Sequence, residues 1–272
     1  MPRSVNEIDI RESKLSRAGN LLDILLIDRT TGKNIIWGTD SYAQYGPRFA
    51  PDRRITKSLI TGKYDMLIQP RAAKSIDEQQ RRTKDKAEVF TPIHIIEKMN
   101  KAVDQSGKFK RITKNNWREY VQQVWLEITC GEGPFIVSRY DPTAHTGELI
   151  PLNKRVGFLD KKLGVISKYC DSKKDWLYWA KEAFKASYGY DWQGDSVLLA
   201  RENLLYTMID FYKDKFVKIP SLKIREEFIE IISWNIFQMD GLKYVVPTTN
   251  IYVKIMDWKN GEIMRFVDLV VA

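Results

Sequence analysis

The feature of this sequence that most constrains its fold is an alternation of strand-like and helix-like segments between residues 124 and 242. Short runs rich in apolar, β-branched or aromatic residues are separated by longer segments with helical spacing. Such alternation is typical of a largely parallel α/β sheet. We expect strands at 124–128, 186–191, within 228–239 and at 265–272, and helices at 175–185 and 196–211.

The segment before residue 88 has a different character. Residues 21–27 and 34–37 flank a Thr-Thr-Gly-Lys turn, which predicts a hairpin. Residues 71–87 carry six Lys or Arg against three acids and have no apolar face, which predicts an exposed helix or linker. We therefore divide the chain into an N-terminal α/β extension, 1–87, and an α/β domain, 88–272. The stretch 138–180 is long for a connection, so we interpret it as an insertion.

Three expected strand ends carry residues suited to a nucleotide-like ligand. Gly131 and Gly133 follow the first strand and let backbone approach a ligand closely. Asp191 follows the second strand, where it can accept hydrogen bonds from ribose hydroxyls or cap a helix. Asp240 follows the third, where it can accept from an exocyclic amine such as that of adenine, or belong to a surface turn. Because ligands of open parallel sheets bind beyond the carboxyl ends of the strands, we expect these residues to share one crevice.

Composition indicates the class of partner. The net charge of +9 favours a polyanion, and nucleic acid is the partner most often implied by such an excess. The two cysteines and the absence of a secretion signal or a long apolar run indicate a cytoplasmic protein without a membrane partner. We expect no metal site. Contacts with DNA or a partner are expected from Arg71, Arg81, Arg82, Arg139, Arg155, Lys161 and Lys162.

The order of these motifs resembles the adenine-specific (N6-adenine) DNA methyltransferases of restriction–modification systems, in particular the proteins called restriction endonuclease subunit M. The resemblance rests on Phe90-Thr91-Pro92, on 127–135, on 189–204 and on Gln238-Met239-Asp240. It implies a Rossmann-like, S-adenosylmethionine-dependent methyltransferase sheet. It also implies double-stranded DNA as the substrate, with the target base flipped out of the duplex.

The resemblance further implies which residues hold S-adenosyl-L-methionine. The Phe-Thr-Pro run would lie against the methionine end of the cofactor, and residues 127–133 would form its glycine-rich loop. Asp191 would hold the ribose, Trp192 would pack on the adenine, and Asp240 would contact the adenine amino group. The complete set is Phe90, Thr91, Pro92, Glu127, Cys130, Gly131, Gly133, Asp191, Trp192, Asp240 and Leu242.

The chain lacks the catalytic motif of that family, Asp/Asn-Pro-Pro-aromatic at the end of the fourth strand. None of its ten prolines are adjacent, and the nearest approximation, Tyr140-Asp141-Pro142-Thr143, lacks the second proline and the final aromatic residue. We therefore assign no catalytic residue. We expect a sheet that is incomplete at the C-terminus, in a chain split or truncated just before its catalytic loop. A second methyltransferase or specificity subunit, or the missing part, would supply catalysis and target recognition.

Three functions remain open at this point. The first is the S-adenosylmethionine-binding portion of a DNA adenine-N6 methyltransferase that is inactive alone. The second is a catalytically inactive DNA- or partner-binding module derived from a methyltransferase. The third is a nuclease, which needs clustered acids around a divalent metal. Its candidates, Asp52, Asp65 and Glu88, are scattered and have no convincing spacing.

Overall fold

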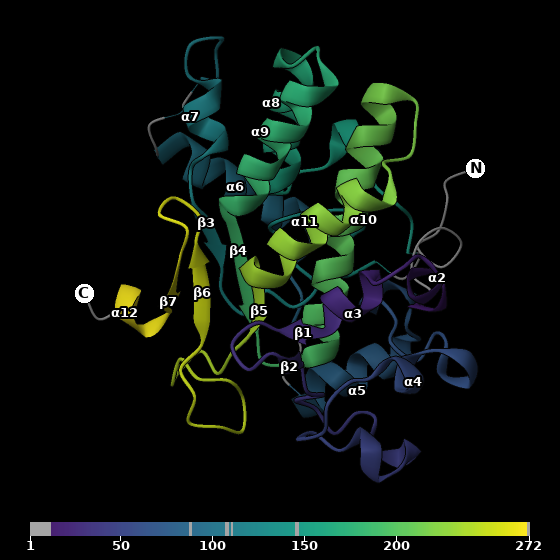
Figure 1. Cartoon of the computed structure of the whole chain (residues 1–272). Helices are drawn as coiled ribbons and strands as arrows, with labels where there is room; N and C mark the ends of the chain where they lie inside the picture. The colour runs from purple at the N-terminus through teal and green to yellow at the C-terminus, as the bar shows by residue number, and fades with distance from the viewer. Residues whose placement is uncertain (1–11, 87–88, 107–108, 110, 145–146, 271–272) are drawn as a thin grey trace.

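The computed structural model describes residues 12–86, 89–106, 109, 111–144 and 147–270. Its centre is a parallel sheet with the strand order β3-β4-β5, in which Glu127 lies opposite Gly189 and Asp191 lies opposite Gln238. The α/β class expected from the alternation is confirmed (Figure 1). The three strands are β3 (Trp125–Glu127), β4 (Ser187–Asp191) and β5 (Ile236–Gln238).

Helices connect the strands and cover one face of the sheet (Figure 1). Two of them begin at a serine whose hydroxyl accepts a backbone N–H, Ser172 from Asp175 and Ser221 from Ile224. The helices expected at 175–185 and 196–211 are confirmed. The connection from β3 to β4 contains α8 (Phe158–Tyr169) and α9 (Lys173–Lys185), and that from β4 to β5 contains α10 (Gly194–Phe216) and α11 (Leu222–Asn235).

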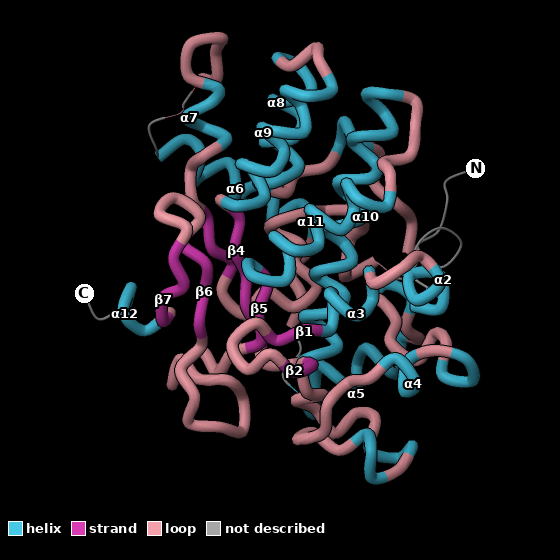
Figure 2. Tube along the Cα trace, viewed as in Figure 1, coloured by secondary structure: helices cyan, strands magenta, loops and turns pink. Residues whose placement is uncertain are grey.

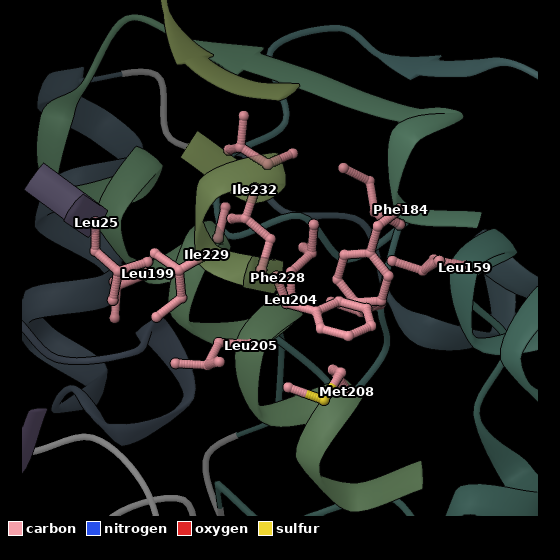
Figure 3. Close-up of a cluster of buried hydrophobic side chains, with 14 of the residues drawn as sticks. Leu25, Leu159, Phe184, Leu199, Leu204, Leu205, Met208, Phe228, Ile229 and Ile232 are labelled. Atoms are coloured by element: carbon pink, nitrogen blue, oxygen red, sulfur yellow. The ribbon is translucent and has the colours of Figure 1, made fainter. Parts of the chain in front are cut away.

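The main hydrophobic core lies among these helices. Figure 3 shows Leu159 of α8, Phe184 of α9, Met208 of α10 and Phe228 of α11 gathered in one cluster, and all four side chains are buried. The rings of Phe184 and Phe228 meet edge to face with their centroids 5.0 Å apart. Truncating one of these side chains to alanine would cost about 2–5 kcal/mol. The core therefore fixes α8–α11 on one face of the sheet.

The N-terminal segment belongs to the same core. α3 (Leu21–Leu26) packs on α10 and α11, and Leu21, Leu22 and Leu25 are fully buried. The expected hairpin is wrong over 21–26, where four buried leucines lie on one helical face. A short apolar run does not distinguish a strand from a buried helix. In this segment the antiparallel pair is limited to β1 (Ile27–Asp28) and β2 (Lys33–Asn34).

The segment 254–270 differs from the expected fourth parallel strand. β6 (Lys254–Asp257) and β7 (Glu262–Arg265) form an antiparallel hairpin, followed by α12 (Val267–Val270). The strand expected at 265–272 is thus wrong over its described residues. Gly261, at φ +73°, makes the turn, and Ile255 and Phe266 pack on Tyr190 and Phe237 of the parallel sheet. The apolar residues cover the second face of the sheet instead of extending it.

The remaining chain forms short helices and long loops (Figure 2). The expected insertion 138–180 contributes to the core through α8, because Leu159, Leu163 and Ile166 are fully buried. No helix within the described ranges is long and apolar enough to cross a membrane. The helices not yet named are α2 (Glu12–Arg17), α4 (Lys57–Ile60), α5 (Ile76–Lys86), α6 (Ile93–Ser106) and α7 (Trp117–Val121). The 3₁₀ turns are η1 (Ala43–Tyr45), η2 (Pro47–Phe49), η3 (Gly62–Tyr64), η4 (Arg71–Ala73) and η5 (Leu152–Lys154).

Candidate functional site

A cavity of about 190 Å³ opens at the carboxyl edge of the parallel sheet. Several of the residues predicted to hold a cofactor line it together, from the segment before α6 and from the ends of β3 and β4. Thr129, Gln193 and Ser196 also line it and were not singled out by the sequence. The predicted residues in its wall are Phe90, Thr91, Glu127, Cys130, Gly131 and Asp191.

Hydrogen bonds join the three strand ends at this edge. The Gly131 N–H donates to Asp191 Oδ2 at 2.9 Å, and the Gln193 N–H donates to Asp191 Oδ1 at 2.9 Å. The Met239 N–H donates to the Asp191 carbonyl at 2.9 Å, so Asp240 follows directly at the same edge. The Asp191 carboxylate is therefore held in one orientation by backbone groups on both of its oxygens.

The loop after β3 has an unusual backbone. Thr129, Gly131 and Gly133 have φ values of +46°, +52° and +75°, in the left-handed region that favours glycine. A Cβ on Gly131 would stand 3.1 Å from Cε1 of Phe90, so that ring packs directly on the glycine. The Arg71 guanidinium lies 5.0 Å from the centroid of the same ring. Phe90 is thus held between a glycine and a cation beside the cavity.

Glu127 is a titratable group in the cavity wall. Its carboxylate accepts from the N–H groups of Phe135, at 3.3 Å, and Ile136, at 3.0 Å. Burial raises the pKa of Glu127 to about 8, although the two backbone N–H groups oppose the shift; the nearby charge of Asp191 adds to it. The carboxyl is therefore mostly protonated at neutral pH, and a cation bound beside it would favour its ionised form.

Cys130 lies in the same cavity wall as Glu127, but its surroundings do not activate it as a nucleophile. Burial raises the pKa of the Cys130 thiol well above its usual range, so it is a poor nucleophile. Among the residues that the structure describes, no group of three or more His, Cys, Asp or Glu is placed to hold a metal ion. Glu88, one of the acids considered for a nuclease, lies outside those residues.

Other predicted cofactor residues lie outside the cavity wall. Pro92 precedes α6, and its carbonyl accepts from the first turn of that helix. Gly133 lies against α10, where an added Cβ would stand 3.5 Å from the Ala200 Cβ. The Trp192 indole N–H donates to the Gly38 carbonyl at 2.8 Å, which ties the end of β4 to the N-terminal segment.

Asp240 and Leu242 form a turn. The Asp240 carboxylate accepts from the N–H of Leu242 at 2.9 Å and of Lys243 at 3.2 Å. The side chain of Leu242 is 93% exposed, so it makes little contact with the protein. The hydrogen bonds of Asp240 are those of the surface-turn alternative. Any contact of these two residues with a nucleotide would be made from outside the cavity described above.

Most of the cations expected to contact DNA are buried, so that expectation is corrected. Arg82 pairs with Asp195 at 2.9 Å, and Arg155 pairs with Asp210 at 2.7 Å. Arg139 also reaches Asp210, at 3.4 Å. These cations neutralise interior carboxylates and are not available to phosphates. The buried residues are Arg71, Arg82, Arg139 and Lys162, and the side chain of Arg155 is 4% exposed. Arg81 is exposed, and Lys161, paired with Asp104, is partly so.

Two further interior links went unpredicted. The Asp195 carboxylate accepts from the Tyr42 hydroxyl at 2.8 Å and from Arg82. The Gln238 amide exchanges hydrogen bonds with the backbone of Ile36, accepting and donating at 2.9 Å. Both links fasten the N-terminal segment to the site edge of the sheet. Tyr42 and Asp195 are 153 residues apart, and no local pattern in the sequence marks such a pair.

The assembled site offers two carboxyl groups, an aromatic ring and a backbone loop with positive φ at the carboxyl edge of a parallel sheet. Comparisons of the chain with protein-family models, with curated proteins and with solved structures give no match. Its function is therefore argued from these residues and from the sequence motifs.

Proposed function

We propose that this chain is the S-adenosylmethionine-binding portion of a DNA adenine-N6 methyltransferase of a restriction–modification system, acting on double-stranded DNA in the cytoplasm. The observation that carries the proposal is the hydrogen bond from Gly131 to Asp191 beside Phe90. It brings the two best motifs of the sequence into one cavity at the sheet edge where α/β proteins bind nucleotides. The fold proposed is the Rossmann-like methyltransferase sheet.

The chemistry of the wall fits this cofactor in part. The two oxygens of Asp191 accept from the N–H groups of Gly131 and Gln193, and a carboxylate oxygen can accept more than one hydrogen bond, so a ribose hydroxyl can bind to the same group. Glu127 suits the cationic end, since its carboxyl ionises readily beside a positive charge. When bound, S-adenosylmethionine supplies the methyl group to be transferred. The cavity of about 190 Å³ is below the ~300–1,000 Å³ of small-molecule sites, so the proposal requires the Phe90 ring to move aside.

Catalysis is assigned to a second polypeptide, because the printed sequence contains no Asp/Asn-Pro-Pro-aromatic motif. Within the described part of the chain, β3 pairs on one side alone, with β4. Leu126 of this strand is 42% exposed, and Val124 and Ile128, which flank the strand, are 69% and 63% exposed. Parallel sheets are normally covered on both faces, and an unpaired strand edge is a template for pairing. A subunit that pairs with the β3 edge and also packs over these side chains would cover them.

Titration calorimetry tests the cofactor proposal. The wild-type chain is expected to bind S-adenosylmethionine, and Asp191→Asn is expected to weaken binding by about tenfold, the equivalent of 1.4 kcal/mol. Asp171→Asn is the matched control, because the Asp171 side chain is fully exposed and precedes α9, whose other end leads into β4. Absence of binding by the wild type, or equal binding by Asp191→Asn, overturns the proposal. Melting curves show whether each variant is folded.

A methylation assay separates the two remaining candidate functions. The chain alone is expected to be inactive on adenine-containing DNA and active with the second polypeptide. The small cavity and the engaged Asp191 carboxylate favour the alternative of an inactive DNA- or partner-binding module. That alternative is supported by DNA or partner binding without S-adenosylmethionine binding. Methylation by the chain alone contradicts the assignment of catalysis to a partner.

A further inference from the structure

A second cavity, of about 370 Å³, lies in the N-terminal part of the chain. It is bounded by η1, η3 and the first turns of α5, and it shares no lining residue with the cavity at the sheet edge. Its volume falls in the range of small-molecule sites, ~300–1,000 Å³. We call it the tyrosine cavity; the lining residues used below are Tyr45, Lys63, Tyr64, Lys74, Glu78 and Arg81.

Lys74 is the residue that indicates a ligand for this cavity. The residue is 8% exposed, and it lines the tyrosine cavity. Its ammonium group forms no hydrogen bond or ion pair with any residue that the structure describes. The nearby Asp195 carboxylate feels the charge of Lys74 but is already bonded to Tyr42 and Arg82. The Lys74 side chain lines the cavity, and an anion bound there would give its ammonium group a charge-assisted partner.

Aromatic rings also line the tyrosine cavity. Tyr45 is 47% exposed, and its ring meets that of Tyr64 edge to face with centroids 6.2 Å apart. Phe49 supports both rings from behind, at 5.7 Å and 5.1 Å between centroids. The Lys63 ammonium lies 4.7 Å from the centroid of Tyr64. Exposed aromatic faces beside cations are the arrangement on which proteins stack nucleobases while holding the attached phosphate.

The charges of the wall select among anions. Three cations, Lys63, Lys74 and Arg81, face two acids, Asp65 and Glu78. Asp65 is engaged, since it accepts from the backbone N–H and the hydroxyl of Ser13 at 3.4 Å and 3.0 Å. The cavity is therefore only modestly cationic and is lined by rings. It suits a ligand with a single phosphate and an aromatic base better than an extended polyanionic surface.

We propose that the tyrosine cavity binds one nucleotide unit, with the phosphate at Lys74 and Arg81 and the base against Tyr45 and Tyr64. The unit is either a free nucleoside monophosphate or one residue of a single strand, because both present the same phosphate and base. The proposal does not rest on S-adenosylmethionine binding at the sheet edge.

Calorimetric titration of the full chain with dAMP, a short oligothymidylate and inorganic phosphate tests this proposal. Lys74→Met keeps an unbranched side chain only one atom shorter and removes the charge, and it is expected to weaken dAMP binding by about tenfold or more. Lys174→Met, at an exposed lysine of α9, is the matched control and is expected to bind dAMP as the wild type does. Tighter binding of the oligothymidylate than of dAMP identifies a strand as the source of the nucleotide, and the reverse identifies the free nucleotide.

Tyr45→Ala provides a test that does not depend on a buried residue. It is expected to weaken dAMP binding while leaving the affinity for inorganic phosphate unchanged. The proposal is overturned if the wild type binds neither dAMP nor the oligothymidylate, or if Lys74→Met binds them as the wild type does. It is overturned as well if phosphate and dAMP bind equally and Tyr45→Ala has no effect. Lys74→Met is expected to bind S-adenosylmethionine normally, so failure here and failure of the proposed function are distinguishable.

Discussion

The backbone N–H of Gly131 and the carboxylate of Asp191 are joined by a hydrogen bond of 2.9 Å beside the sheet-edge cavity. The bond connects the loop after β3 to the end of β4, although the two residues are 60 positions apart in the sequence. It fixes the carboxylate before any ligand arrives, which lowers the cost of ordering the site on binding. Because of this bond, the position of the Asp191 carboxylate depends on the backbone conformation of Gly131.

Gly131→Ala is expected to destabilise the protein and to weaken S-adenosylmethionine binding. The left-handed backbone costs an alanine about 1 kcal/mol, and the new Cβ would push on the Phe90 ring from 3.1 Å. Gly32→Ala is the control, since Gly32 has φ +68° but nothing within 4 Å of an added Cβ. Urea unfolding should show a similar loss of stability in both variants, and calorimetry should show weaker binding, by about tenfold, in Gly131→Ala alone. Equal affinities would contradict a role for this loop in binding.

Glu127 is expected to couple binding of a cationic ligand to proton release. Its pKa of about 8 in the free protein means that the carboxyl is mostly protonated at pH 7. A cation beside it lowers that pKa, so affinity should rise as the pH increases toward 8. Calorimetry of S-adenosylmethionine in two buffers of different ionisation enthalpy measures the proton released. Glu127→Gln should release none, and a wild-type protein that releases none would count against contact of the cation with this carboxyl.

The same group makes stability depend on pH in the absence of ligand. Glu127 ionises near 4.5 in an unfolded chain and near 8 in the fold. Between these values the folded state holds the extra proton, so its contribution is complete below 4.5 and is lost as the pH rises through 8. Glu127→Gln should make the free energy of unfolding fall less steeply with pH. Part of the fall should remain, because burial also raises the pKa of Glu12 to about 8. Urea unfolding from pH 5 to 8 measures the slope, and an unchanged slope would contradict the shift.

Arg82→Met is expected to destabilise the fold by about 3 kcal/mol, because it leaves the Asp195 carboxylate buried without its ion-pair partner. Tyr42 and the nearby charge of Lys74 remain, which keeps the loss at the lower end of the usual range. Lys84→Met, at an exposed position of the same helix, should change stability by no more than about 0.5 kcal/mol. If the loss of stability in the double variant Arg82→Met/Asp195→Asn equals the sum of the losses in Arg82→Met and Asp195→Asn, measured in urea, the two residues are not coupled.

The sequence predicted the parallel sheet because its signals are local. The strand that ends at Asp191 and the long helix after it show their periods within a few turns. Since the carboxyl ends of parallel strands share one edge, the meeting of Gly131 and Asp191 followed from the same reading. The glycines after β3 were recognisable by type, and their positive φ values explain why glycine stands there.

The interior ion pairs could not be predicted in the same way. Arg155 and Asp210 are 55 residues apart, and Arg82 and Asp195 are 113 apart. From the sequence alone a basic residue in a polar segment is expected to be in solvent, because burial of a charge is costly without a partner that only the fold supplies. The strand predicted over the leucines at 21–26 was wrong for a related reason, since a short apolar run fits a buried helix as well as a strand.

Lys162 gives a pH dependence opposite in sign to that of Glu127. The ammonium is buried and donates to the carbonyls of Gln123, at 2.5 Å, and Ala186, at 3.2 Å. Burial lowers the pKa of Lys162 from its usual 10.5 to about 7. Between these values the unfolded chain binds the extra proton, so stability rises as the pH increases from 7 toward 10.5. Near neutral pH the carboxyls at 12 and 127 oppose this trend, and their opposition fades as the pH rises above 8 and they become ionised in the fold as well.

Unfolding in urea between pH 8 and 10 therefore isolates this lysine. The wild type should gain about 2 kcal/mol over that interval relative to Lys162→Met, which carries no titrating group at this position. Lys168→Met, at an exposed position of the same helix, should follow the wild-type curve. Parallel curves for the wild type and Lys162→Met would mean that Lys162 keeps an ordinary pKa in the fold, through water or a conformational change that reaches its ammonium group.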